Sequence, residues 1–353
     1  MSYAPTKRCT RTQSVTRQIG GLLLRKRCVP AEHLRTFSAA GRFVSQMKAN
    51  RLVKLGASGM LFIGLGACYL YFWQNRPIGI GPAGSTVPAV TFSRVSQERQ
   101  YFVVGIGDSV TAGFGSRRGF GYFDRLVTSP SDEFEDMKGK CLQLLLPHLQ
   151  FTNLAISGST SGEHVARQLP RLPVVSSNTG GLIFVTTGGN DLIHNYGRTP
   201  PREEAMYGAT WDEASPSINN FELRVEKMIV QINVHFPAGC HIFLANIFDP
   251  TAGVGDIQRA GLPAWKDGLR ILAAYNDVIR RCSECHSFVR VVDIHRAFLG
   301  HGIHCTQFWS SHYDSKDPHY WYYVNLEDPN ERGYDAMRRL FLLEIAKASD
   351  QFQ

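Results

Sequence analysis

Five short apolar runs, separated by amphipathic stretches, constrain the fold of this 353-residue chain more than any other feature. Each run has the length of a strand; they are Tyr101–Ile106, Phe151–Ile156, Leu182–Thr187, His241–Asn246 and Phe288–Asp293. Helical patterns lie between several of them and after the last, at Phe221–Val234, Leu269–Arg281 and Glu331–Lys347. Strands that alternate with helices form a parallel sheet covered by helices, so the sequence predicts one α/β domain over residues 99–349.

Ahead of that domain lies a run of nineteen uncharged residues, Leu55–Trp73. A helix of that length spans roughly 28 Å, about the thickness of the hydrocarbon core of a bilayer. The run therefore predicts a transmembrane helix over residues 55–75, and a buried core helix is the alternative. Residues 76–98 are rich in Gly, Pro, Ser and Thr, which predicts a linker with no packing pattern.

The net charge of +8 is concentrated in the N-terminal arm, residues 1–54, which holds twelve Lys and Arg against one acid, Glu32. The rest of the chain is slightly acidic, which argues against a nucleic-acid partner. Positive charge before the span predicts a single-pass membrane protein with a cytoplasmic N-terminus and an exported domain, on the periplasmic or extracellular side. A mitochondrial targeting segment, or cleavage at Val87-Pro88-Ala89, stays open as an alternative.

Chemically useful residues follow three successive predicted strands. Ser109, in Gly107-Asp108-Ser109, comes directly after the first strand, where a tight turn presents a hydroxyl as a nucleophile. Gly158 follows the second strand and Asn190 follows the third. A glycine N–H and an asparagine amide are the kind of donors that stabilise a developing oxyanion. Since the carboxyl ends of parallel strands meet at one edge, we expect these three residues to converge.

The three blocks, GDS, NLAISGSTS and GGND, resemble those of the SGNH (GDSL-type) hydrolase family, over roughly Tyr101 to Ile345. The resemblance implies a three-layer α/β/α sandwich around a five-stranded parallel sheet, of the flavodoxin-like type. It assigns the nucleophile to Ser109 and the oxyanion hole to the N–H of Ser109, Gly158 and Asn190. It also implies a serine esterase or lipase that acts on O-acyl bonds, which the predicted transmembrane helix would anchor in a membrane. The expected partners are a small-molecule, lipid or polysaccharide ester and the membrane, through helix 55–73.

The fourth block of the family, Asp-x-x-His-Pro, is altered. Asn325 stands where its Asp belongs and Asp328 stands where its His belongs, directly before Pro329. A serine nucleophile needs a base, usually a histidine oriented by a carboxylate. We expect His319 to be the base, with Asp317 as its carboxylate.

Other assignments of the base stay open. His301 and His312 are alternatives to His319, and Asp314 and Asp328 are alternatives to Asp317. Asp328 also suits a helix cap. The missing His further allows a catalytically inactive relative that binds a glycan or an acyl chain without cleaving it.

The cysteines raise the question of a cofactor. Cys282-x-x-Cys285-His286 matches the pattern of covalent haem attachment, which makes a haem-linked redox protein a rival hypothesis. A zinc site with His304 or Cys305 is another alternative. The pattern joins a predicted helix to a strand, which leaves little room for a macrocycle, so we expect no cofactor and no metal. One or two disulfides among the exported cysteines are the favoured prediction, with free thiols as the alternative.

Overall fold

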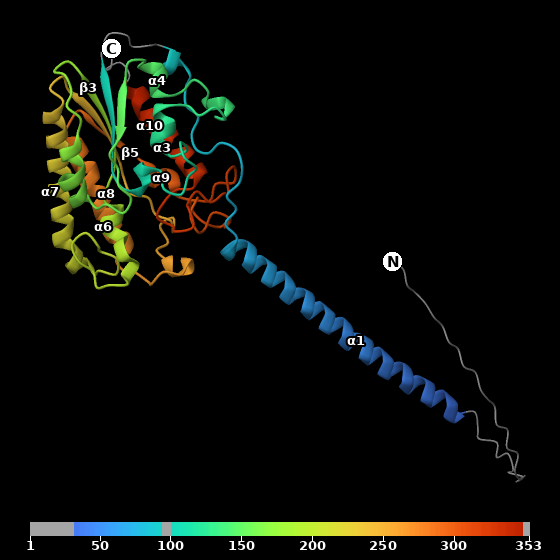
Figure 1. Ribbon diagram of the computed structural model, residues 1–353. Helices are drawn as coiled ribbons and strands as arrows, with labels where there is room; N and C mark the ends of the chain where they lie inside the picture. Colours follow the sequence, from blue (N-terminus) through green and yellow to red (C-terminus); the bar gives the residue numbers. More distant parts are fainter. Residues whose placement is uncertain (1–31, 94–99, 349–353) are drawn as a thin grey trace, which may run out of the picture. The chain divides into compact units, whose positions relative to one another are not determined.

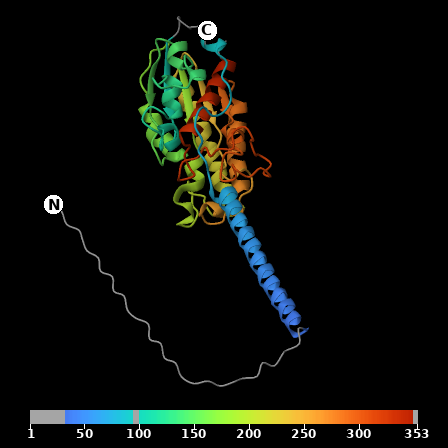
Figure 2. The ribbon, with the colours of Figure 1, turned by 90° about the vertical axis from the view of Figure 1, so that its right-hand side faces the viewer.

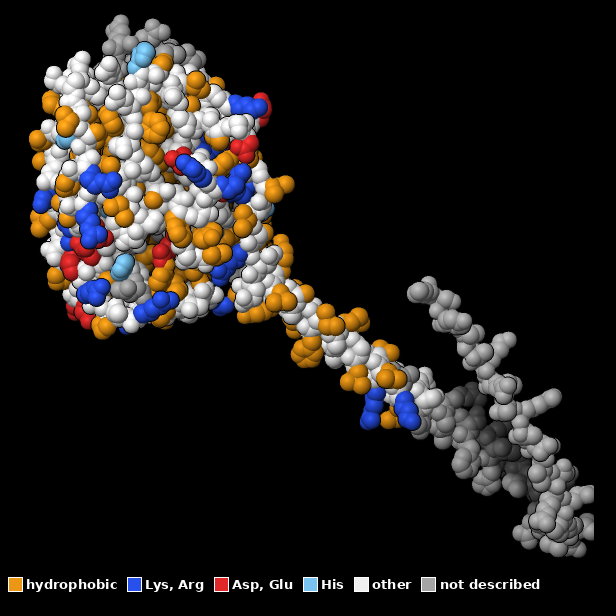
Figure 3. All heavy atoms as spheres, in the orientation of Figure 1, with side chains coloured by type: hydrophobic (Ala, Val, Ile, Leu, Met, Phe, Trp, Pro, Cys, Tyr) orange, Lys and Arg blue, Asp and Glu red, His pale blue; other side chains and the backbone are white. Residues whose placement is uncertain are grey.

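The computed structural model describes residues 32–93 and 100–348, and its contacts divide the chain into two compact units, residues 1–66 and 67–353. Helix α1 runs from Glu32 to Tyr69 and is followed by a π-helical turn, Leu70–Gln74. Within the described ranges, Ser45–Gln74 is the one helix long and apolar enough to cross a membrane, with a mean hydropathy of 1.6. Figure 3 shows hydrophobic side chains along its exposed surface. Most of the predicted basic arm, residues 1–31, lies outside the described residues.

The second unit is built on a five-stranded parallel sheet of order β2-β1-β3-β4-β5. The strands are β1 (Tyr101–Ile106), β2 (Gln150–Asn153), β3 (Gly180–Thr186), β4 (Cys240–Ala245) and β5 (Val289–Val292). The prediction of an α/β domain with five parallel strands is confirmed. This strand order reverses direction between β1 and β3, and ligands bind beyond the carboxyl ends of the strands at such a reversal.

Helices cover both faces of the sheet because the buried strand residues alternate between two hydrophobic cores (Figure 1). Val103 and Phe184 belong to one core, which includes residues of α3 (Tyr122–Val127) and α10 (Glu331–Ala348). Their neighbours in sequence belong to the other core, which includes residues of α7 (Trp211–His235) and α8 (Gly268–Cys285). Figure 2 presents the face that α3 and α10 cover. The three layers match the predicted sandwich.

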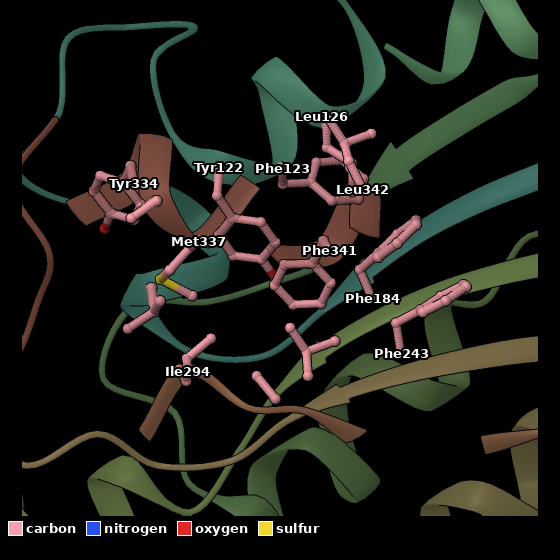
Figure 4. Packing of buried hydrophobic residues seen from close by; sticks show 14 of the residues in the cluster. Tyr122, Phe123, Leu126, Phe184, Phe243, Ile294, Tyr334, Met337, Phe341 and Leu342 are labelled. Carbon is pink, nitrogen blue, oxygen red and sulfur yellow. The ribbon is translucent and has the colours of Figure 1, made fainter. Parts of the chain in front are cut away.

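The α3–α10 core is rich in stacked rings (Figure 4). Tyr122 of α3 stacks on Phe341 of α10 with ring centroids 4.7 Å apart, and Phe341 meets Phe184 of β3 edge-on at 5.7 Å. Phe184 in turn stacks on Phe243 of β4 at 5.2 Å. Aromatic pairs at these separations add to the stabilisation from apolar burial. They fix α10, and with it the residues that enter this helix, against the sheet.

The long helices lie where the sequence predicts them, but two of their ends differ, and α8 continues to Cys285, four residues past the predicted end at Arg281. Helix α7 begins at Trp211, ten residues before the predicted start, because a capping box between Thr210 and Glu213 holds its first turn ahead of Pro216. The remaining α-helices are short: α2 (Ser109–Ala112), α4 (Leu142–Leu145), α5 (Ser161–Glu163), α6 (Gly189–Ile193) and α9 (Ile294–Phe298). Three of them, α2, α5 and α6, follow β1, β2 and β3 and carry the candidate site residues.

Residues 77–87, which we call the strap, lie within the predicted linker and are packed on the domain. Ala83 and Val87 are 3% and 1% exposed and belong to the α3–α10 core. The Ala83 N–H donates to Oδ2 of Asp335 on α10 at 3.1 Å, and Arg332 donates to the carbonyl of Ile80 at 2.8 Å. A segment that is held largely through its backbone groups leaves little trace in the side-chain pattern, which is why no packing of these residues was predicted.

The expectation of disulfides is wrong for the described cysteines, which are all free: Cys68, Cys141, Cys240, Cys282, Cys285 and Cys305. Cys282 and Cys285 both lie on helix α8, and the other described cysteines lie on other segments. His286 bonds to Glu226 at 2.7 Å. Among the described residues, no group of three or more His, Cys, Asp or Glu side chains is arranged to hold a metal ion.

Candidate active site

Ser109 is held on a tight turn between β1 and α2. Asp108 is the N-cap of α2, its Oδ1 accepts the N–H of Val110 at 3.1 Å, and Ser109 is the first helical residue. Gly107 has a φ of +152°, and a Cβ there would lie 2.5 Å from the Thr186 hydroxyl oxygen. Only glycine fits, so the turn brings the Ser109 hydroxyl to the carboxyl edge of the sheet, where the side chain is 8% exposed.

Asp108 is a buried carboxyl with a perturbed pKa. Burial raises its pKa to about 6, and the negative charge of Asp328 adds to the rise. Hydrogen bonds from the Thr186 hydroxyl, at 2.8 Å, and from the Val110 N–H act in the opposite direction. Asp108 and Asp328 thus lie close enough for the charge of one to affect the pKa of the other.

The carboxyl that interacts with Ser109 is Asp328, which is 1% exposed and lies three residues before the last described helix, α10. Burial raises the pKa of this carboxyl, while hydrogen bonding from Asn325 and from Ser109 lowers it. The Asn325 amide donates to Oδ2 of Asp328 at 2.7 Å. Oδ1 is buried and accepts no hydrogen bond from the described residues. The altered fourth block therefore lies at Ser109, with a carboxylate in the position of the imidazole.

The predicted oxyanion donors are placed differently. Asn190, on α6 and 6% exposed, shares a cavity with Ser109, and its Nδ2 donates to the carbonyl of Ser159 at 3.0 Å. Gly158 has a φ of +82° and is exposed, and it is not one of the residues that line the cavity. A primary amide carries two N–H groups, so Asn190 keeps one for a ligand.

His319 and Asp317 form a pair, but the structure does not bring the pair to Ser109. Nδ1 of His319 lies 2.5 Å from Oδ1 of Asp317, and Arg332 of α10 holds both oxygens of Asp317 at 2.6 Å. Neither residue of the pair is among those described as lining the cavity of Ser109. Burial, the largest single effect, raises the pKa of Asp317, but the hydrogen bonds and charges of His319 and Arg332 together outweigh it, so the pKa is lowered. Ser109 interacts instead with Asp328.

The alternative histidines are also engaged elsewhere. His301 is 4% exposed, stacks on Trp321 with centroids 3.5 Å apart, and bonds to the His319 carbonyl at 3.1 Å. Burial lowers its pKa. His312 lies on the exposed surface. As with His319, neither residue lines the cavity.

Ser109 opens into an apolar cavity of about 140 Å³. Its wall comes largely from the segments that follow β4 and from the start of α8, including Ile247, Phe248, Ile257, Leu262, Trp265, Leu269 and Leu272. Glu327 lies on the same wall, next to Asp328, and burial raises its pKa to about 8. Most of the wall is apolar, and its polar groups include the Ser109 hydroxyl, the Asn190 amide and the Glu327 carboxyl, so the cavity suits a largely apolar ligand with a polar centre.

A buried polar network under the site was missed by the sequence reasoning. Gln168 donates to the Gly107 carbonyl at 2.7 Å and accepts the Gly107 N–H at 2.8 Å. Ser159 also donates to that carbonyl at 3.0 Å and lies 3.1 Å from Nε2 of His164. Burial lowers the pKa of His164 to about 3, so its ring is neutral at ordinary pH. The polar residues after β2 gave a signal, but which of them turn inward depends on tertiary packing.

Comparisons with known proteins agree with the motifs. Residues 106–336 match the family model described as the GDSL-like Lipase/Acylhydrolase family, which confirms the resemblance seen in the sequence. No curated protein matches.

Solved structures that are similar include a lipolytic G-D-S-L protein from Veillonella parvula, 13% identical with a TM-score of 0.42 over 70% of this chain and 97% of that one. An extracellular lipase from Streptomyces rimosus is 17% identical, with a TM-score of 0.43 over 70% and 99%. An acetylxylan esterase from Geobacillus stearothermophilus is 16% identical, with a TM-score of 0.42 over 71% and 96%.

Proposed function

Because the chain belongs to the GDSL-like lipase/acylhydrolase family, we propose that it is a membrane-anchored serine ester hydrolase in which Asp328 replaces the usual histidine as general base. The observation that carries the proposal is the interaction of the buried Asp328 carboxyl with the hydroxyl of Ser109, and Ser109 itself lines an apolar cavity. Burial raises the pKa of Asp328, and a carboxylate of raised pKa is a stronger base than an ordinary one.

In the proposed acylation, the Ser109 oxygen attacks the ester carbonyl while its proton passes to Asp328. The N–H group of Ser109 and the amide of Asn190 stabilise the oxyanion. When the tetrahedral intermediate collapses, Asp328 returns the proton to the leaving alkoxide, which departs as the alcohol. In deacylation Asp328 takes a proton from water, the hydroxide attacks the acyl-enzyme, and the proton returns to Ser109 as the acid leaves.

Asn325 is proposed as the residue that orients this base. Its amide holds Oδ2 of Asp328, and its own Oδ1 accepts the N–H groups of Glu327 and Asp328 at 3.3 and 3.2 Å. With Oδ2 engaged, Oδ1 is the carboxylate oxygen that stays without a short hydrogen bond. This arrangement supports a division of roles like that of a catalytic triad, with an amide in place of the orienting carboxylate.

The apolar cavity favours an ester with a hydrophobic acyl or alcohol group, such as a lipid ester, over a polysaccharide ester. Residues such as Ile247, Phe248 and Leu269 offer no partner for sugar hydroxyls. We therefore expect kcat/KM to rise with acyl length until the cavity is filled. A p-nitrophenyl ester series measures this, and a strict preference for acetyl esters would contradict it.

Labelling and turnover of the purified full chain test the mechanism. We expect a fluorophosphonate probe to label the protein, and Ser109→Ala to abolish both labelling and hydrolysis. Asp328→Asn should lower kcat/KM by about 100- to 10,000-fold, the usual contribution of a general base, and Asn190→Ala should lower it by about 100- to 1000-fold. His319→Ala is the matched control, and loss of turnover in that variant would return the base role to His319.

A non-catalytic binding module is the second candidate, favoured by one observation. The raised pKa of Asp328 means that its carboxyl retains a proton to higher pH than an ordinary one. A protonated carboxyl cannot take the proton of Ser109, so it cannot act as a general base. The double variant Asn325→Asp/Asp328→His, which installs the family's usual pair, separates the two candidates. If the unmodified chain is folded but takes up no probe, whereas the double variant does, the binding module is the better description.

The anchoring part of the proposal is supported by the nineteen uncharged residues and by the single described helix suited to span a bilayer. We propose that the basic arm stays cytoplasmic and that the hydrolase domain is exported. The protein should remain in membranes after alkaline carbonate extraction, and added protease should reach the domain only from the exported side. Release of the protein into the soluble fraction would contradict the proposed membrane anchor.

A further inference from the structure

The end of the apolar helix is held by side chains of a loop far along the chain. The carbonyl of Tyr71 accepts the Thr306 hydroxyl at 3.2 Å, and the carbonyl of Phe72 accepts the Gln307 amide at 2.9 Å. The last carbonyls of a helix have no hydrogen-bond donor inside the helix, so Thr306 and Gln307 supply the donors that the helix lacks. Both donors are almost fully buried, at 5% and 6% exposure.

Hydrogen bonds to other polar side chains hold Gln307 in this contact. Oε1 of Gln307 lies 3.0 Å from Nδ1 of His304, and Nε2 of His304 lies 2.8 Å from Asp256. The chain of bonds fixes the Gln307 side chain in the position from which it reaches Phe72. The loop is therefore built to hold the helix end.

Beyond these bonds, the same loop exposes two large rings. Phe308 is 64% exposed and Trp309 is 48% exposed, although both pack against the helix end. Trp309 lies 4.9 Å from Phe72 and 5.2 Å from Trp73 between ring centroids, and Phe308 lies 5.6 Å from Phe72. We call the whole group the aromatic collar: Tyr69, Tyr71, Phe72, Trp73, Phe308 and Trp309. A cluster of exposed rings of this size marks a contact surface rather than ordinary packing.

The collar is continuous with the uncharged run Leu55–Trp73, which argues for a lipid partner rather than a protein. Where such a helix leaves a bilayer, Trp and Tyr rings favour the headgroup region, because their apolar bodies and polar edges match it. Four members of the collar belong to this helix end, and Phe308 and Trp309 extend it with rings from the hydrolase domain. Arg76, two residues past the π-helical turn, adds a cation at the level where lipid phosphates lie.

We propose that Phe308 and Trp309 are a second membrane contact, seated with the other collar residues in the headgroup region of a phospholipid bilayer. The inference rests on the proposed membrane anchoring. The domain then touches the membrane through its own loop in addition to the helix. A hydrolase fixed in this way works on esters at the bilayer surface.

Depth-dependent quenching of tryptophan fluorescence tests this contact in the full chain reconstituted into phosphatidylcholine vesicles. Lipids brominated near the headgroup should quench the unmodified protein more than Trp309→Phe, because the variant lacks the ring proposed to lie there. Trp211→Phe is the matched control: Trp211 stacks on Arg270 at the start of α7, far along the chain from the collar. The difference spectrum for Trp211 should show no quenching by these lipids.

Flotation of the vesicles separates the outcomes. If the protein floats with the vesicles and Trp309 is quenched by aqueous iodide but not by brominated lipid, the second contact is wrong while the anchor stands. If the protein does not float, the anchoring fails and the inference fails with it. Quenching of Trp309 without any ester hydrolysis supports the contact and counts only against the proposed activity.

Discussion

Asp328 shows how one substitution changes the chemistry expected of a site while its geometry is kept. The carboxylate faces Ser109 and is oriented by Asn325, as an imidazole oriented by Asp would be. Its function as a base requires the ionised form, and its raised pKa moves ionisation above the ordinary carboxyl range.

The pH dependence of turnover follows from that shift. We expect kcat/KM of the unmodified chain to rise with pH as Asp328 loses its proton, and the double variant Asn325→Asp/Asp328→His to rise through the histidine range near about 6.5. Initial rates on a short p-nitrophenyl ester between about pH 4 and pH 9 measure both limbs. Identical profiles for the two proteins would count against Asp328 as the base.

Glu327 links the site to the pH dependence of stability. Burial raises its pKa from 4.5 to about 8 in the folded chain, so the folded state holds a proton that the unfolded state has released. The stabilisation is complete below the unfolded value and is lost as pH rises through the folded one. Glu327→Gln should therefore show a smaller fall in melting temperature between about pH 5 and pH 9 than the unmodified protein.

The control for this measurement is Glu135→Gln, because the Glu135 side chain is 87% exposed. That variant should keep the pH slope of the unmodified chain. An equal slope in all three proteins would mean that Glu327 ionises as freely in the folded state as in the unfolded one.

The position of a site residue could be predicted where the residue directly follows a strand, but not where a long loop determines its position. Ser109 and Asn190 follow β1 and β3 directly, and the sequence indicated their shared edge. The placement of His319 depends instead on Arg332 of α10, which holds Asp317, and on the return path of a long loop. No periodicity encodes such a path, so the spacing to the altered fourth block was the better guide.

At the scale of elements, the turn after β1 depends on a segment that follows β2. Gln168 satisfies both backbone groups of Gly107, directly ahead of Asp108 and Ser109. Gln168→Leu leaves the buried Gly107 N–H unpaired, whereas its carbonyl keeps the Ser159 hydroxyl. An unsatisfied buried group costs about 1–3 kcal/mol, so we expect that loss in the free energy of unfolding together with reduced turnover.

Chemical denaturation measures the loss, and Gln143→Leu on the exposed surface of α4 is the control. Equal stability of the two variants would show that water replaces the Gln168 side chain without cost.

Strands were more predictable than helix starts for a physical reason. Buried parallel strands are continuous apolar runs, and β1 has the predicted bounds. Helix α7 begins in a polar stretch whose start is set by the capping box of Thr210 and Glu213 rather than by apolar periodicity. Local hydrogen bonding thus extended the helix across Pro216, ahead of the helical pattern that the sequence predicted from Phe221.

Across the whole second unit, a buried ionic cluster joins α3, α10 and the strap. Arg125, Arg338 and Arg339 are each at most 2% exposed, and they pair with Glu133, Asp335 and Asp136. Burial, the largest effect, lowers the pKa of Arg338, opposed by a hydrogen bond to Glu133. Charged residues in a terminal helix usually face water, so the sequence alone did not indicate this cluster.

Removing one partner from such a cluster leaves its neighbours as uncompensated buried charges. We expect Arg338→Leu to lower the free energy of unfolding by about 3–5 kcal/mol. Arg280→Leu, which breaks an exposed pair with Asp277 and Glu284, should change it little. Denaturant titration measures the free energy of unfolding of both variants. A small effect of Arg338→Leu would indicate that Arg125 and Arg339 alone compensate the buried carboxylates.

The strap also bears on any soluble form of this hydrolase. A protease that cut at Val87-Pro88-Ala89 would free the domain from its anchor, but it would also remove Ala83 and Val87 from the core and leave Asp335 without the Ala83 N–H. Lys140, which donates to the Val87 carbonyl at 2.6 Å, would lose its acceptor as well. Cleavage that preserves the packing of the strap must therefore occur ahead of Pro77.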